Sequence, residues 1–284
     1  MNHPNRKETG MTFFAKAHAC GNDFLVVEGA CNTALAVHLC NRHTSVGADG
    51  VEFLEWTDER SGRIRLANAD GSIAEISGNG TRCVAAWMAH QIAQKGAPLA
   101  SGATLEIDTD AGLRTCTLVK AEGHRYEFAA PMGVPQVAKR SVRLADGTSV
   151  EGVVVHTGNP HFVIFVEDEN FTAYQRTWEE LGREICFHAD FPEQTNVEFV
   201  HILAPGHIAI RIFERGVGPT TSSGTGTCAT ASATIATRNG ESTLRVVAPG
   251  GEQRIDWPSP DAEILLIGPA ELICTGEAWR GEAW

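Results

Sequence analysis

SGNGTRC at residues 77–83 opens an alanine-rich stretch, VAAWMAHQIAQ, and SGTGTC at residues 223–228 opens another, ATASATIATRN. The two motifs lie 146 residues apart (223 minus 77), and the tripeptide VEF that starts at Val51 recurs after the same 146 residues. A third pair, HACGNDFLVV from His18 and HTGNPHFVIF from His156, keeps the same order. Three pairs in one order indicate an internal duplication rather than chance matches between glycine-rich turns.

Short segments rich in β-branched and aromatic residues predict strands, and four longer apolar stretches predict helices. The predicted strands are FLVVE (24–28), VEFLEW (51–56), IRLAN (64–68), ATLEID (103–108), CTLVK (116–120), YEFAA (126–130), VEGVVV (150–155), HFVIFV (161–166), VEFVHI (197–202), IAIRIFE (208–214), STLRVVA (242–248) and AEILLIG (262–268). The predicted helices are ALAVHLCNRH (34–43), TRCVAAWMAHQIAQ (81–94), WEELGREICFH (178–188) and CATASATIATRNG (228–240). Because an apolar helix needs a surface to bury against, we predict an α+β fold of two pseudosymmetric domains. Each would be an α/β half-barrel, with a curved, mainly antiparallel sheet around one central helix.

The division between the two halves is predicted near Pro131, where AAPMGVPQVAKR supplies the proline and glycine residues of a crossover. The last nine residues contain GEAW twice and are predicted to form a frayed tail. The predicted parts are a disordered tail (1–10), an N-terminal half (11–130) joined by a returning C-terminal segment (271–284), and a C-terminal half (131–270).

Composition excludes several classes of protein. The chain has 284 residues, a mass of 30.5 kDa and a formal net charge of −12, so it lacks the basic surface that binding to nucleic acid or anionic lipid requires. No apolar run approaches the roughly 20 residues that span a bilayer, and no membrane association is expected. The eight cysteines show neither disulfide-framework spacing nor a CxxC pair, so we expect free thiols, no metal site and a cytoplasmic location.

The repeated motif places a serine and a Gly-x-Gly turn at the start of a helix. Unpaired amides and the positive end of the helix dipole bind anions there, and glycines let the backbone approach a carboxylate. Two such helix ends, facing each other across a cleft between the halves, would hold one carboxylate and set Ser77 and Ser223 on opposite faces of its α-carbon. That arrangement predicts stereochemical inversion without a cofactor.

The chain resembles the diaminopimelate epimerase family from about Phe14 to Cys274. The motifs that carry the resemblance are GNDF (21–24), GADG (47–50), NADGS (68–72), GNGTRC (78–83), GNPH (158–161), TNVEF (195–199), ERGVG (214–218) and SGTGTC (223–228). The resemblance implies two pseudosymmetric halves, with the C-terminal strand returning to the first. It also implies a cofactor-independent isomerase that converts LL-diaminopimelate into the meso form for lysine and peptidoglycan biosynthesis, and the family includes homodimers.

Matching the motifs residue by residue implies individual roles. Arg215 would bind the distal carboxylate of this small-molecule substrate, because a planar guanidinium suits bidentate recognition. Glu214 and the asparagines would satisfy the distal ammonium, and His161 would assist proton transfer. The predicted catalytic residues are Ser77, Ser223, His161 and Glu214. The predicted substrate-binding residues are Asn22, Asn68, Gly78, Asn79, Asn159, Asn196, Glu214, Arg215, Gly224 and Thr225.

Both acid/base positions depart from the family, which has cysteines where this chain has Ser77 and Ser223. A free thiol has a pKa of about 8.5, whereas an aliphatic hydroxyl is about as weak an acid as water, at about 15.7. The gap of ~7 pKa units makes the alkoxide roughly 10 kcal/mol harder to form than the thiolate. Cys83 and Cys228 are no substitutes, because they match other family cysteines inside the helices.

Several interpretations of the serines remain open. The chain is a natural variant whose serines still catalyse turnover of the substrate, or it carries an engineered Cys-to-Ser pair, or it is a homologue that binds diaminopimelate without turnover. Pro219, Ile73 and Ser222 also depart from the family residues, which favours natural drift over editing. A related amino-acid racemase or dehydratase is a further alternative, against which the retained Glu214 and Arg215 argue.

Overall fold

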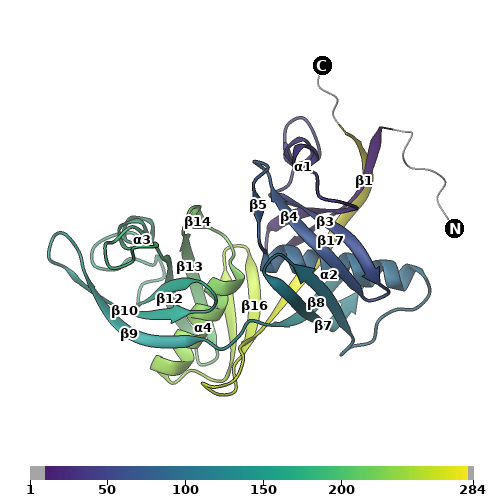
Figure 1. Cartoon of the computed structure of the whole chain (residues 1–284). Helices are drawn as coiled ribbons and strands as arrows, with labels where there is room; N and C mark the ends of the chain where they lie inside the picture. Colours follow the sequence, from purple (N-terminus) through teal and green to yellow (C-terminus); the bar gives the residue numbers. More distant parts are fainter. Residues whose placement is uncertain (1–9, 281–284) are drawn as a thin grey trace. The chain divides into compact units, whose positions relative to one another are not determined.

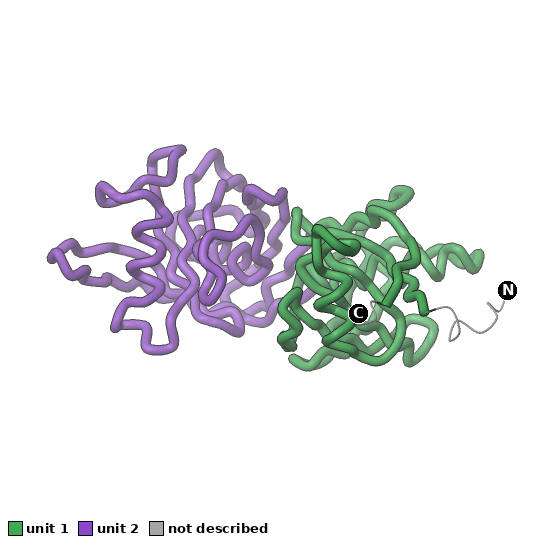
Figure 2. The backbone as a smooth tube through the Cα atoms, turned by 90° about the horizontal axis from the view of Figure 1, so that it is seen from above, with its two compact units in different colours: residues 1–129, 269–284 green, residues 130–268 purple. Residues whose placement is uncertain are grey.

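The computed structural model describes residues 10–280, which form two compact units (Figures 1 and 2). Of the described residues, unit 1 comprises 10–129 and 269–280, and unit 2 comprises 130–268. Of the predicted disordered tail, all but Gly10 lies outside the described residues.

Unit 1 is a closed sheet around one long helix. Its strands pair in the order β1–β2–β3–β4–β6–β7–β8–β17, and β17 pairs again with β1, so the sheet closes on itself. The elements, in chain order, are β1 (Met11–Ala19), β2 (Asn22–Glu28), α1 (Thr33–Cys40), β3 (Gly50–Asp58), β4 (Ser61–Asn68), β5 (Ile73–Ala74), α2 (Gly78–Gln94), β6 (Thr104–Thr109), β7 (Gly112–Glu122), β8 (Arg125–Pro131) and β17 (Leu265–Trp279).

Unit 2 repeats this plan. Its strands pair in the order β9–β10–β11–β12–β13–β15–β16, and the first residues of β17 pair with β16. The elements are β9 (Gln136–Arg143), β10 (Ser149–His156), β11 (Pro160–Val166), α3 (Trp178–Cys186), β12 (Asn196–Ala204), β13 (His207–Glu214), β14 (Gly218–Thr220), α4 (Gly224–Arg238), β15 (Thr243–Ala248) and β16 (Gly251–Asp256).

The duplication seen in the sequence is a duplication of topology. Parallel pairs occur at matching places, β2–β3 and β4–β6 in unit 1 and β11–β12 and β13–β15 in unit 2, while the other recorded strand pairs in both units are antiparallel. The register of the strand pairs agrees with the alignment of the two sequence repeats. Val26 lies beside Glu52 in the β2–β3 pair, and Val163 lies beside Glu198 in the β11–β12 pair. The predicted fold class is therefore confirmed.

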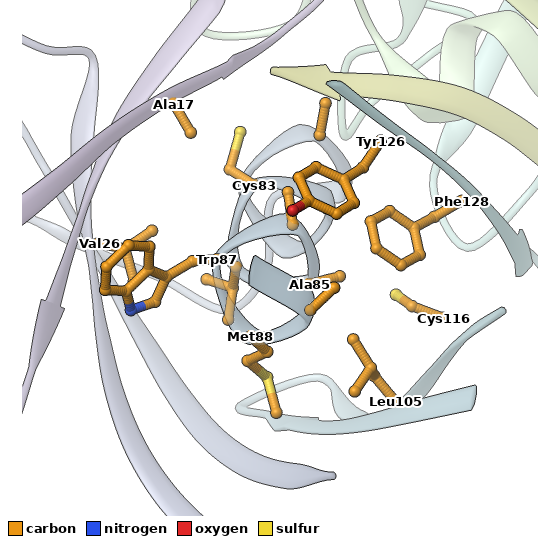
Figure 3. Close-up of a cluster of buried hydrophobic side chains, with 14 of the residues drawn as sticks. Ala17, Val26, Cys83, Ala85, Trp87, Met88, Leu105, Cys116, Tyr126 and Phe128 are labelled. Atoms are coloured by element: carbon orange, nitrogen blue, oxygen red, sulfur yellow. The ribbon is translucent and has the colours of Figure 1, made fainter. Parts of the chain in front are cut away.

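Helix α2 forms the centre of the unit 1 core. Apolar side chains cover most of its circumference, which is typical of a helix buried on all sides, and strands β1, β2, β3 and β6 pack against it. Trp87 and Met88 point outward from α2 toward this surrounding sheet, with Val26, Leu105 and Phe128 in the same cluster (Figure 3). Fully burying side chains of this size contributes about 1.5–3 kcal/mol each.

Helix α4 has the same place in unit 2, where β9, β10, β11, β12, β15 and β16 pack against it. Its buried face is built from small residues, including Ala229, Ala231 and Ala233, so the surrounding strands approach closely. Threonines on this helix are buried without loss of hydrogen bonding, because Thr230 and Thr234 donate to backbone oxygens one turn earlier.

The chain end differs from the prediction. Residues 276–279 of the predicted frayed tail belong to β17, because β1 supplies a partner strand in which Met11 lies opposite Trp279. Arg280 follows β17 and its amide donates to the Gly10 carbonyl oxygen, and residues 281–284 of that tail lie outside the described residues.

Candidate active site

Ser77 is the N-cap residue of α2. Its Oγ accepts a hydrogen bond from the amide of Gly80 at 3.1 Å, and its carbonyl oxygen accepts from the Thr81 hydroxyl at 2.8 Å. The side chain of Ser77 is half-buried, and a Cβ added to Gly78 would meet nothing within 4 Å. The hydroxyl and the first amides of α2 therefore border open space that an anion can enter.

Ser223 is the N-cap residue of α4 with nearly the same geometry. Its Oγ accepts from the amide of Gly226 at 3.2 Å, and its carbonyl oxygen accepts from the Thr227 hydroxyl at 2.8 Å. The hydroxyl oxygens of Ser223 and Thr225 lie 3.5 Å apart. A Cβ on Gly224 would meet one neighbouring atom, the Leu266 Cδ2 at 3.3 Å, so this glycine is more closely packed than Gly78. Unit 2 thus repeats the serine-capped helix start of unit 1.

The second glycine of each turn has a different role from the first. A Cβ on Gly80 would overlap the Oε1 of Glu52, and a Cβ on Gly226 would lie 3.0 Å from the Oε1 of Glu198. Each second glycine therefore makes room for a buried carboxyl at the first turn of the helix. The prediction that these glycines admit a ligand fits the first glycine of each pair better than the second.

Glu52 and Glu198 are site residues that the sequence prediction missed, although the repeated VEF contains them. Both side chains are completely buried. Burial raises the pKa of Glu52 to about 8, and neither of its oxygens has a hydrogen-bond partner among the described residues. Burial also raises the pKa of Glu198, while the neighbouring His161 opposes that rise.

His161 joins the predicted residues of unit 2 to Glu198. Its Nδ1 lies 2.7 Å from the Oε1 of Glu198 and its Nε2 lies 2.9 Å from the Oδ1 of Asn159. Each contact joins one ring nitrogen to one oxygen atom, so the ring is held between a carboxyl and an amide group. His161 is completely buried, so these two partners fix its orientation.

Glu214 is the last residue of β13, and Arg215 follows it directly. Burial raises the pKa of Glu214, the nearby carboxyl of Glu198 raises it further, and His161 opposes both effects. The Arg215 amide donates to the Oδ1 of Asn196 at 2.8 Å, and its guanidinium donates to the carbonyl oxygen of Glu193 at 2.9 Å. The latter contact uses one of five guanidinium N–H groups, so a bidentate carboxylate contact remains available.

The predicted asparagines of unit 1 form a chain of hydrogen bonds. Asn79 donates to the Oδ1 of Asn22 at 3.2 Å, and Asn22 donates to the Oδ2 of Asp49 at 2.7 Å. The buried Arg82 donates to the Oδ1 of Asn79 at 2.6 Å and so fixes the orientation of that amide. Asp49, which the sequence prediction left out, therefore orients Asn22.

Asn68 is the last residue of β4 and lies opposite Gly50 in the β3–β4 pair. Gly50 directly follows Asp49 in the chain. The Nδ2 of Asn68 donates to the Ser72 hydroxyl at 2.9 Å. Unit 1 thus gathers Ser77, Gly78, Asn79, Asn22 and Asn68, and unit 2 gathers Ser223, Gly224, Thr225, Asn159, His161, Asn196, Glu214 and Arg215.

None of the eight cysteines forms a disulfide bond. Cys83 and Cys228 are completely buried in the two helix cores, and burial raises the pKa of Cys83 well above its ordinary value. A buried thiol in apolar surroundings is unreactive, so neither side chain takes the place of the serines.

Residues 10–280 contain neither a candidate metal site nor a helix that could span a membrane. Among these residues, no three histidine, cysteine, aspartate or glutamate side chains are grouped so as to hold a metal ion. No helix in the same range has both the length and the apolar character needed to cross a membrane.

Known proteins similar to this chain point to one family. The model of the family described as diaminopimelate epimerase matches residues 14–137 and 153–273. The diaminopimelate epimerase of Desulforudis audaxviator is 35% identical over 283 residues, covering 93% of this chain and 98% of the relative. The diaminopimelate epimerase of Halothermothrix orenii is 36% identical over 288 residues, covering 93% and 96%.

Solved structures with low sequence identity share the fold. A phenazine biosynthesis protein of the PhzF family from Bacillus anthracis has a TM-score of 0.68 at 15% identity, covering 94% of this chain and 98% of its own. A hydroxyproline epimerase from Agrobacterium vitis, with bound trans-4-hydroxy-L-proline, has a TM-score of 0.65 at 14% identity, covering 96% and 94%.

Proposed function

Because the chain belongs to the diaminopimelate epimerase family, we propose that it interconverts LL- and meso-diaminopimelate by two-base proton transfer, in which one serine hydroxyl takes up the α-proton on one face and the other serine hydroxyl delivers a different proton on the opposite face. No cofactor takes part. The observation that carries this proposal is the matched pair of serine-capped helices, each with a buried glutamate at its first turn. Inversion requires one acid/base group on each face of the α-carbon, and the duplication supplies one in each half.

The helix N-termini would bind the carboxylate of the reacting centre. Negative charge develops on this carboxylate as the α-proton leaves, so amides and dipoles that are already oriented toward it stabilise the transition state. Gly78, Asn79, Gly224 and Thr225 would supply the contacts. Ser77 would then remove or return the proton on one face.

The distal end of the substrate would be recognised in unit 2. The guanidinium of Arg215 would bind the distal carboxylate in a bidentate fashion, and Glu214 with the neighbouring asparagines would bind the distal ammonium. A simple amino acid would leave these groups unsatisfied, which disfavours its binding. His161 and Glu214 would support proton transfer at Ser223.

A direct assay tests the proposal. Purified protein is incubated with LL-diaminopimelate, and the LL and meso isomers are resolved by chiral chromatography, with L-lysine as a substrate lacking the distal carboxylate. We expect the meso isomer to accumulate from LL-diaminopimelate, and no D-lysine to form. Absence of meso product, at enzyme concentrations where ligand binding is measurable, contradicts the proposal.

Binding without turnover is the second candidate, and it is favoured by one observation. Both serine hydroxyls already accept hydrogen bonds as helix caps, and capping alone is a sufficient structural reason for a serine at such a position. The same assay separates the two functions, because a binding protein stabilises on addition of diaminopimelate without forming product.

We also infer a cytoplasmic location and a homodimer. Eight free thiols suit a reducing compartment, and the homodimer follows from the family alone. Light scattering after size exclusion tests the dimer, which should have a mass of twice 30.5 kDa. A mass equal to that of one chain contradicts it.

A further inference from the structure

Two buried glutamates occupy matching positions beneath the two serine-capped helices. Glu52 on β3 and Glu198 on β12 are the middle residues of the repeated VEF, and both lie against the second glycine of their turn. Placing a carboxyl in a core without full hydrogen bonding costs stability. A costly feature that recurs at both candidate acid/base positions points to a use in the chemistry.

Glu52 has the simpler surroundings. Its Oε1 fills the space where a Gly80 side chain would lie, and the Ser77 Cβ is 3.2 Å from that same point. The Glu52 carboxyl and the Ser77 side chain therefore flank Gly80. Neither oxygen of Glu52 is hydrogen bonded among the described residues, so both can accept or donate a proton.

Among the described residues, burial alone accounts for the raised pKa of Glu52. Electrostatic effects on Cys83 place that thiol together with Glu52, Arg82, Cys20 and Asp23 in one neighbourhood. Arg82 and Cys83 belong to α2, Cys20 follows β1, and Asp23 belongs to β2. Burial is the cause that raises the pKa of Glu52 to about 8.

A serine hydroxyl cannot hold the substrate proton in the way that a cysteine can. When a thiolate removes the α-proton, the resulting thiol is stable near neutral pH, since its pKa is about 8.5. A serine must pass its own proton to another group as it takes up the new one, as serine does with a neighbouring base in other enzymes. Unit 1 therefore needs a proton acceptor behind Ser77.

Resting on the epimerase activity proposed above, we propose that Glu52 is the positioning residue that exchanges this proton with Ser77. The Cα–H bond of the substrate breaks, its electron pair stays on the α-carbon and carboxylate, and a new O–H bond forms at the Ser77 Oγ. The original hydroxyl proton of Ser77 passes to the Glu52 carboxylate, which becomes a neutral carboxylic acid. In the reverse direction the same proton returns.

Unit 2 holds the corresponding groups in a different form. Glu198 is paired with His161 at 2.7 Å, and Glu214 lies close enough for its pKa to respond to both. His161 and its carboxyl partners would supply the proton for Ser223 on the opposite face. Each serine would thus have its own neighbouring acid/base group to exchange a proton with.

The experiment compares Glu52→Gln with Glu55→Gln, which removes an exposed carboxyl from the same strand. The kcat/KM for LL-diaminopimelate is measured from pH 6 to pH 10 for both variants, for the wild type, and in a Ser77→Cys background. We expect Glu52→Gln to lower kcat/KM by about 100-fold or more and to remove the limb of the pH profile near pH 8, while Glu55→Gln keeps both. With Ser77→Cys, the same Glu52→Gln change should cost less than about threefold, because a thiol holds the proton itself.

The outcomes are distinct. Equal losses from Glu52→Gln in the serine and cysteine backgrounds, or an unchanged pH profile, show that Glu52 only fills the core and contradict the proposal. A Glu52→Gln protein with wild-type turnover contradicts this proposal alone. No turnover by the wild type and by Glu55→Gln contradicts the epimerase function and this inference with it. Unfolding by urea identifies a misfolded variant, and Glu52→Leu, which suits a core position, then replaces Glu52→Gln.

Discussion

Glu52 in unit 1 and Glu198 in unit 2 occupy matching strand positions, but the neighbouring strands β2 and β11 carry different residues at one matching place. His161 pairs in register with Asn196 on β12, and Phe24 stands at the matching place on β2, in register with Gly50. Glu198 therefore has a ring nitrogen at 2.7 Å, whereas neither oxygen of Glu52 has a hydrogen bond among the described residues.

The presence of His161 beside Glu198 alone gives the two carboxyls pKa shifts with different causes. Both are raised in pKa by burial, but only Glu198 has a neighbour that opposes the rise. One fold, duplicated, thus supports two proton-transfer groups with unequal properties, which suits a reaction that removes a proton on one face and delivers it on the other.

The largest expected effect comes from removing each hydroxyl separately. Ser77→Gly and Ser223→Gly should each lower the rate of epimerisation by about 10²- to 10⁴-fold, the usual contribution of a general acid or base. Glycine is chosen because it keeps most of the capping stability. Chiral chromatography measures the rate, and a large loss for one serine alone would mean that the halves do not share the chemistry.

The second effect is on the pH dependence of stability. A carboxyl with a raised pKa in the folded state keeps a proton that the unfolded chain releases, so the free energy of unfolding falls as pH rises from 4.5 to about 8. For Glu52 this fall amounts to a few kcal/mol, on the order of 1.4 per pKa unit. Below pH 4.5 the penalty disappears.

Urea unfolding at a series of pH values tests this expectation. Glu52→Gln should flatten the curve between pH 4.5 and pH 8, and Glu198→Gln should flatten it less, because His161 opposes the shift in unit 2. Equal flattening by both variants would mean that His161 makes no electrostatic difference between the halves.

A third, smaller effect separates the glycines of the two turns. Gly80→Ala should lower the free energy of unfolding by about 1–3 kcal/mol, because the added methyl overlaps the Glu52 carboxyl in a packed core. Gly226→Ala meets Glu198 at 3.0 Å and should cost less, and Gly78→Ala meets open space. Urea unfolding gives the order, and a Gly78 variant as destabilised as the Gly80 variant would contradict it.

The smallest effect concerns helix capping. Ser77→Ala and Ser223→Ala should each destabilise the protein by about 1 kcal/mol, and the glycine variants by a few tenths, because both hydroxyls accept an amide hydrogen bond. The two halves should respond equally. Thermal unfolding measures this, and a cost confined to one serine would show that the two caps are not equivalent.

The repeated motifs predicted much of the fold. Four predicted helices correspond to α1, α2, α3 and α4, and each repeat marks the same point in both units. Strands β1, β5, β9, β14 and β16 were not predicted. The sequences of β9 and β16, QVAKRSVR and GEQRID, are polar and lack apolar alternation. These segments form strands because neighbouring strands pair with them. Pairing partners that are distant in the sequence cannot be recognised from the local residues.

The candidate site was predicted in part for a similar reason. Serines and glycines at helix starts have a recognisable spacing, so Ser77 and Ser223 could be identified with their turns. Glu52 and Glu198 lie inside apolar strands, where a glutamate is expected on the exposed face. Only the packing of β3 and β12 beneath the helices shows that both carboxyls are buried.

The most direct test of a two-base reaction shared by the halves is deuterium incorporation at early times. LL-diaminopimelate is incubated with the wild-type protein in deuterated water, and mass spectrometry follows the LL and meso pools separately before they equilibrate. We predict that the meso product carries one solvent deuteron from its first appearance, while the remaining LL substrate stays unlabelled. Deuterium appearing in the LL pool as fast as in the meso pool would contradict two separate bases, and meso product without deuterium would mean that a single group carries the proton across.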